Sequence, residues 1–84
     1  MHPTTLSKYP GTLEDLATEV ASLRYDKVAE FLHYLGEEIR KQRDADRRRG
    51  RSRLASRLEE TAEGLYKARD CFKRAWDICK PYER

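Results

Sequence analysis

Residues 54–79 read LASRLEETAEGLYKARDCFKRAWDIC and decide the fold of this chain. Apolar or small residues recur in this stretch at alternating spacings of four and three, the period of one face of an α-helix. The members of this stripe are Leu54, Leu58, Thr61, Leu65, Ala68, Phe72, Ala75 and Cys79. The pattern predicts one continuous helix of about seven turns.

A second stripe with the same period precedes it. Its members are Tyr25, Val28, Leu32, Leu35 and Ile39, and the period continues through the polar residues Gln42 and Asp46. The run RRRGRSR at residues 47–53 separates the two stripes and contains Gly50, which suits a left-handed helix end. Two matched stripes joined by a short glycine turn predict an antiparallel helical hairpin.

The predicted fold is therefore all-α, a long hairpin with a short N-terminal helix packed on its open end. Residues 1–11 form an extended lead-in, and residues 12–84 form a single helical-bundle domain. We expect helices over about residues 12–23, 26–49 and 52–80, with Thr12, Asp26 and Ser52 as N-caps. Folding at residues 50–52 pairs positions whose numbers sum to roughly 102. Leu32, Leu35, Leu58, Leu65, Phe72 and Trp76 are expected to be among the most buried side chains.

Charge is unevenly distributed along the 84 residues, of which 39% are charged and 38% hydrophobic. Residues 40–57 hold nine basic and two acidic side chains, a net +7, so that the rest of the chain carries −4. We call residues 40–57 the basic tip. Glu59, Glu60 and Glu63 should neutralise part of it across the hairpin. Six arginines are left as candidate contacts for a polyanion or a partner protein: Arg47, Arg48, Arg49, Arg51, Arg53 and Arg57.

Arginine clusters bind phosphate oxygens in RNA and DNA, but no aromatic residue lies among these six to stack on bases. An acidic protein, a membrane surface and a simply solvated end are alternative interpretations of the tip. Tyr34 and Tyr66 fall outside the two stripes and are the second candidate, an association surface.

Other motifs favour neither an enzyme nor a cofactor. Glu30 and His33 have the spacing of half a di-iron site, yet helical phase places both on the outer side of the hairpin. Cys71 and Cys79 lie about 12 Å apart on one helix, too far for a disulfide, and are expected to be buried and reduced. No nucleophile has a neighbouring base, and no glycine-rich phosphate loop is present. We expect no bound metal and no cofactor.

The predicted function is that of a small non-enzymatic helical interaction module. It would bind a protein partner or a second copy of itself, because a charged domain of this length often completes its core by association. The alternative is a nucleic-acid-binding accessory protein that uses the arginines of the tip as a phosphate clamp. No apolar stretch approaches the length of a membrane span, and free cysteines favour a cytoplasmic location.

Overall fold

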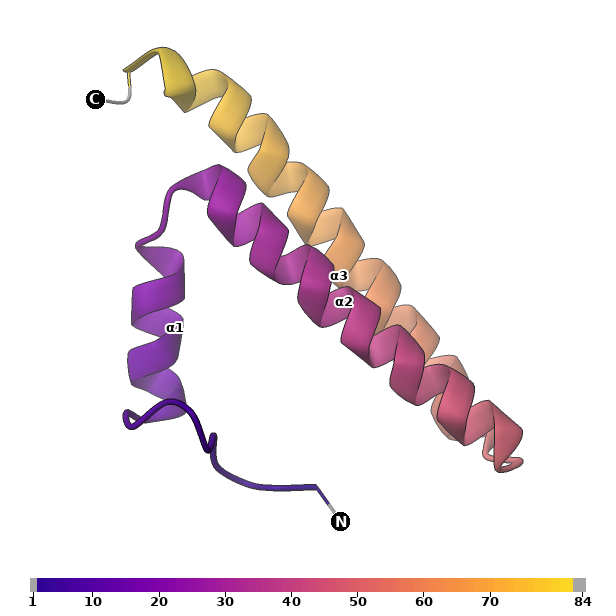
Figure 1. Ribbon diagram of the computed structural model, residues 1–84. Helices are drawn as coiled ribbons and strands as arrows, with labels where there is room; N and C mark the ends of the chain where they lie inside the picture. The colour runs from indigo at the N-terminus through magenta and orange to yellow at the C-terminus, as the bar shows by residue number, and fades with distance from the viewer. Residues whose placement is uncertain (1, 83–84) are drawn as a thin grey trace.

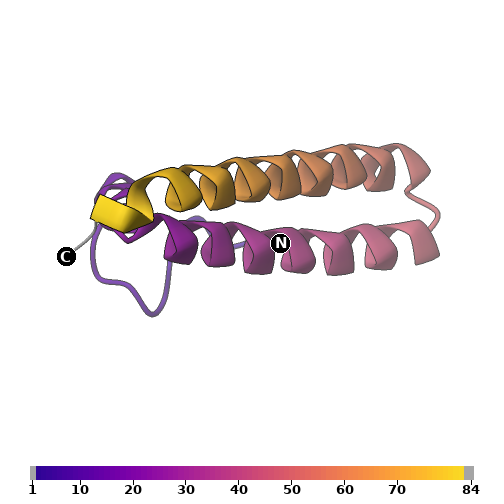
Figure 2. The same ribbon diagram turned by 90° about the horizontal axis from the view of Figure 1, so that it is seen from above.

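The computed structural model describes residues 2–82 and is an all-α fold, as predicted (Figure 1). The helices are α1 (Leu13–Ala21), α2 (Tyr25–Arg48) and α3 (Ser52–Cys79), followed by a 3₁₀ turn, η1 (Lys80–Tyr82). Helices α2 and α3 run antiparallel, side by side over their whole length, in both views (Figures 1 and 2). All helix boundaries lie within two residues of those expected from the sequence.

Local capping signals explain where α1 begins and where the chain bends. The Thr12 hydroxyl accepts a hydrogen bond from the Asp15 backbone N–H at 3.0 Å, and the Asp15 carboxylate accepts one from the Thr12 N–H at 3.0 Å. These two bonds complete a capping box, and the bond from the Thr12 N–H holds the pKa of the Asp15 carboxyl group below its ordinary value. Asp26 does not cap α2, contrary to expectation. It lies in the first turn and accepts two hydrogen bonds from the Arg24 guanidinium instead, at 2.7 and 2.8 Å.

The turn between α2 and α3 is a Schellman motif built on Gly50, whose φ of +75° is the left-handed conformation that glycine adopts without strain. The Gly50 N–H donates to the Arg47 carbonyl at 3.1 Å, and the Arg51 N–H donates to the Asp46 carbonyl at 2.9 Å. Helix α3 starts directly afterwards, with Ser52 as its first helical residue rather than its cap. It continues without a break through Gly64.

Side-chain contacts confirm the predicted register of the hairpin. Arg69 Nη1 lies 2.8 Å from His33 Nδ1, and Arg43 donates to Glu59 across the helices. A Cβ placed on Gly36 would lie 2.6 Å from Cε1 of Tyr66, so these two residues also face each other. The numbers in each of these three pairs sum to 102.

The residues along the line where the helices meet are smaller than expected. Ala29 and Gly36 of α2, and Ala55 and Ala62 of α3, are buried and stand at heptad spacing; we call this line the interhelical seam. Small side chains let the two backbones approach closely. Five of the six larger apolar residues expected in the core are displaced from the seam by one position, whereas Trp76 is in phase with it, and none of the six is buried. Leu35, for example, is 38% exposed, so the expectation that it is a core residue was wrong.

This displacement gathers both apolar stripes on one side of the hairpin. Successive residues of an α-helix differ by about 100° in direction, so a stripe one position before the seam points sideways. Because α2 and α3 are antiparallel, the same displacement turns both stripes toward the same side. We call this side the apolar face; its members are Val28, Leu32, Leu35, Ile39, Leu54, Leu58, Leu65 and Phe72. The opposite, charged face carries residues one position after the seam, such as Glu30, Glu37, Glu63 and Asp70.

Helix α1 stands beside the open end of the hairpin and slants away from it (Figure 1). The side chains between them place α1 on the side of the apolar face. A groove of about 340 Å³ separates them, lined almost entirely by apolar side chains. Leu16, Ala17 and Val20 line it from α1, and Val28 and Phe72 line it from the hairpin. The predicted position of α1 is thus observed, with a groove in place of a tightly packed third helix. The remainder of the apolar face, toward the tip, extends beyond α1.

Candidate interaction surfaces

The structure divides the six candidate arginines of the tip into two groups. Three have carboxylate partners: Arg51 and Arg49 lie 3.3 and 3.9 Å from Asp46, and Arg57 lies 3.0 Å from Glu60. The other three, Arg47, Arg48 and Arg53, are exposed and have no carboxylate within 4.0 Å in the described part of the chain. Half of the cluster predicted from the sequence is therefore unpaired.

Asp46 organises the turn, a role that the sequence did not reveal. Its side chain is only 12% exposed, and its carboxylate faces the guanidinium groups of Arg49 and Arg51. Its carbonyl also accepts the closing hydrogen bond of the Schellman motif. Asp46 thus holds the turn in a fixed shape while reducing the charge that the tip offers to a ligand.

Fewer of the basic side chains are neutralised by the opposite helix than expected. Arg43 pairs with Glu59 on α3 and with Asp44 on its own helix, and its hydrogen bonds hold the pKa values of both carboxyl groups below their ordinary values. Lys41 pairs with Glu38 on α2, and Glu60 pairs with Arg57 on α3. Among the three acidic residues expected to reach across, Glu59 is the one with an observed interhelical ion pair within residues 2–82.

Tyr66 lies inside the hairpin contact rather than outside it, so its predicted position was wrong. Its ring packs over Gly36, and its hydroxyl donates to the Glu37 carboxylate at 2.6 Å. The Arg69 guanidinium stacks over the same ring at 4.8 Å. Desolvation of the ring and the hydrogen bond to Glu37 raise the pKa of Tyr66 above its ordinary value. Tyr66 therefore fixes the register of the helices.

His33 was also misplaced by the sequence. It is half-buried and meets Arg69 across the hairpin, instead of lying on the outer side. Glu30, its partner in the Glu-x-x-His pattern, is exposed and pairs with Lys27 at 3.1 Å. No group of three or more His, Cys, Asp or Glu side chains with metal-binding geometry occurs within the described range.

Tyr34 is 60% exposed and points away from the seam and the apolar face. Its ring contacts the edge of His33 at a centroid distance of 5.7 Å. An association role remains a prediction for Tyr34 alone, because Tyr66 lies in the contact between the helices.

The two cysteines occupy different environments. Cys71 is exposed, which contradicts its expected burial, and the Arg74 guanidinium donates to its sulfur at 3.3 Å. Cys79 is half-buried near the open end. The reason lies in the seam: position 71 falls on the outer side of α3 once the contact line runs through Ala62 and Arg69.

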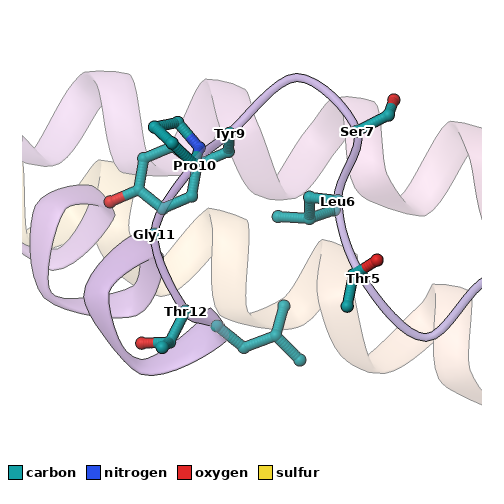
Figure 3. Close-up of a pocket in the computed structure, with 8 residues that line it drawn as sticks. Thr5, Leu6, Ser7, Tyr9, Pro10, Gly11 and Thr12 are labelled. Atoms are coloured by element: carbon teal, nitrogen blue, oxygen red, sulfur yellow. The ribbon is translucent and has the colours of Figure 1, made fainter.

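The N-terminal lead-in attaches to α1 and not to the hairpin. Tyr9 packs beside Gly11 at the start of α1, and a hydrogen bond with Glu19 raises the pKa of its hydroxyl. Figure 3 shows the lead-in curling back, with Leu6 and Gly11 on opposite sides of a pocket of about 300 Å³. All residues that line this pocket come from residues 5–13, so it is a feature of one local segment.

The most extensive candidate surface is the apolar face, which is incompletely covered. The side chains buried in the hydrophobic core are Val28, Ala29, Ala55 and Ala62, three of them alanines, and within residues 2–82 no large side chain is fully buried. Meanwhile Leu35 and Leu54 are 38% and 46% exposed. Such an arrangement of small buried residues beside large exposed ones is unusual for a monomer and typical of a surface that contacts another molecule.

Comparison with protein-family models, with curated proteins and with solved structures finds no match for this chain. No helix in the described residues has the length and apolar character needed to cross a membrane.

Proposed function

We propose that this chain is a small, non-enzymatic helical module that binds another protein chain through the apolar face of its hairpin. The observation that carries the proposal is the difference in residue size between the interhelical seam and the apolar face. Alanine and glycine form the contact between the helices, whereas leucine and phenylalanine stay accessible beside it. Burying apolar area contributes about 25 cal/mol per Å², so a surface of this kind favours association. We place the module in the cytoplasm, since its two cysteines stand eight positions apart on one helix and cannot pair with each other.

Affinity capture from the native host with matched variants tests this proposal. Leu35→Lys puts a charge on the apolar face, and Ser56→Lys puts the same charge on an exposed position one residue after Ala55, on the opposite side of the hairpin. We expect bound protein, including untagged copies of the chain itself, to be lost with Leu35→Lys and retained with Ser56→Lys. Equal retention by both variants would contradict a role for the apolar face, and so would the absence of any bound protein with the wild type.

A second candidate function is the phosphate clamp at the tip. The observation that favours it is the set of unpaired arginines, Arg47, Arg48 and Arg53, beside a turn held in shape by Asp46 and Gly50. Phosphate contacts by arginine give binding that weakens steeply as salt rises. The test compares wild type with Arg47→Gln/Arg48→Gln/Arg53→Gln in binding to generic RNA and DNA across a salt series. Anionic vesicles are included to separate nucleic acid from a membrane surface.

The matched control is Arg49→Gln/Arg51→Gln/Arg57→Gln, which removes the same charge from arginines that already have carboxylate partners. Salt-sensitive nucleic-acid binding that is lost in the first variant and largely kept in the control would support the clamp. No wild-type binding at low salt would exclude it.

A further inference from the structure

We infer that the partner covering the apolar face is a second copy of this chain, bound antiparallel, so that the basic tip of each copy lies against α1 of the other. This inference rests on the proposed function, because it names the occupant of the same surface.

The exposed area of the monomer is the first argument. The accessible surface is 6994 Å², whereas a compact monomer of 9.9 kDa exposes about 5,200 Å². The excess is roughly 1,800 Å², and the exposed lead-in at residues 2–11 accounts for part of it. Half of the excess would equal the ~800 Å² that each partner buries in a standard protein interface. A dimer through the apolar face therefore restores an ordinary surface area.

The shape of the molecule agrees with this account. The radius of gyration is 15.4 Å, compared with about 12 Å for a compact chain of this length. The extents of 50 × 29 × 14 Å describe a slab little thicker than one layer of helices. Stable helical domains bury their apolar side against a second layer. A second hairpin supplies that layer and forms a four-helix bundle.

Charge decides how the two copies are oriented. In a parallel pair, two tips of +7 would lie side by side and repel each other. In an antiparallel pair, each tip meets the part of the other copy that carries −4. Helix α1 contributes Glu14, Asp15 and Glu19 and no basic residue. Charge complementarity therefore favours the antiparallel arrangement, which is also a closed two-fold dimer.

The lengths of the elements fit this arrangement. The part of the apolar face beyond α1 runs from about Leu35 to the end of α2 at Arg48, 14 residues or about 21 Å. In the antiparallel dimer, this uncovered part of one copy packs against the same part of the other copy. Each tip then lies at the level of Phe31 on the other copy. Phe31 lies where α1 crosses the hairpin, since it lines the groove between them. The tip then reaches the acidic helix without any change in either monomer.

Sedimentation velocity over a concentration series tests whether the dimer forms and which surface holds it. We expect a dimer for wild type and for Ser56→Lys, and monomers for Leu35→Lys and Leu54→Lys. Both leucines are already exposed in the monomer, so circular dichroism should show that the two lysine variants keep their helices. A monomeric wild type at every concentration would overturn the inference. A dimer that survives both leucine substitutions would overturn it as well.

A distance measurement tests the orientation. Spin labels are attached at Ser52→Cys, at the exposed turn, in a Cys71→Ser/Cys79→Ser background. Antiparallel overlap separates the two labelled turns by about 20 Å or more. A parallel pair would bring them to within about 10 Å, the spacing of packed helices. The shorter distance would overturn the antiparallel arrangement.

The two tests separate this inference from the proposed function. If the wild type is monomeric but captures a different protein that is lost with Leu35→Lys, the apolar face is a binding site and the second copy is the wrong occupant. If nothing binds the face in either experiment, both proposals fail.

Discussion

Replacing Gly36 with alanine should destabilise the hairpin, although removing a glycine from the middle of a helix ordinarily stabilises it by about 1 kcal/mol. A Cβ at this position would lie 2.6 Å from Cε1 and 3.1 Å from Cζ of Tyr66. The ring cannot simply rotate away, since its hydroxyl is bonded to Glu37 and Arg69 stacks on it. Overpacking of this kind costs about 1–3 kcal/mol, so we expect a net loss of about 1 kcal/mol.

Gly64 provides the matched control because it is also in mid-helix, and a Cβ added there would meet no neighbouring side chain or helix within 4 Å. Gly64→Ala should gain about 1 kcal/mol, so that the two variants differ by about 2 kcal/mol, or roughly 8–16 °C in Tm. Thermal unfolding followed by circular dichroism measures this difference. All samples need the same protein concentration, because the proposed self-association would make Tm concentration-dependent.

A double-mutant cycle identifies the cause. In a Tyr66→Ala background the ring is absent, and Gly36→Ala should then stabilise the protein as Gly64→Ala does. The reasoning would be refuted if Gly36→Ala raised Tm in the wild-type background, or if it remained destabilising after Tyr66 was removed.

Three further outcomes are expected. Phe72→Ala should lower the free energy of unfolding by about 2 kcal/mol, less than the ~3–5 kcal/mol lost with a fully buried phenylalanine, because its ring is only half-buried. A loss within that higher range would place Phe72 in a closed core. Gly50→Ala should lower the free energy of unfolding by about 1–2 kcal/mol because position 50 has a φ of +75°, and Gly50→Asn should lower it by less. Equal stability of the wild type and both variants would contradict the left-handed turn. Folding raises the pKa of the Tyr66 hydroxyl above its ordinary value of 10.0. The stability gained from the protonated hydroxyl is therefore complete below pH 10 and is lost as the pH rises through the raised pKa. The free energy of unfolding of Tyr66→Phe should fall less than that of wild type over this alkaline range.

Much of the fold was predictable because its signals are local. The capping box at Thr12, the glycine at position 50 and the proline after Lys80 each mark a helix end in the sequence itself. The register followed from the position of the turn.

The direction in which each helix faces its neighbour was not predictable from the apolar period alone. That period identifies the apolar side of a helix, but it does not show that this side faces the other helix. The heptad spacing of Ala29 with Gly36, and of Ala55 with Ala62, was the signal for the true seam. Tyr66, His33 and Cys71 were misplaced for the same reason, since a shift of one residue turns a side chain by about 100°.

The separation of seam and face has a consequence for how this hairpin tolerates sequence change. Positions on the seam accept only small residues or the few polar groups that bridge the helices, such as Arg43 with Glu59. The exposed positions of the apolar face, such as Leu35 and Leu54, can take other apolar residues without altering how α2 meets α3. If the apolar face binds a partner as proposed, binding specificity can be redesigned there independently of the fold, starting with Leu35 and Leu54.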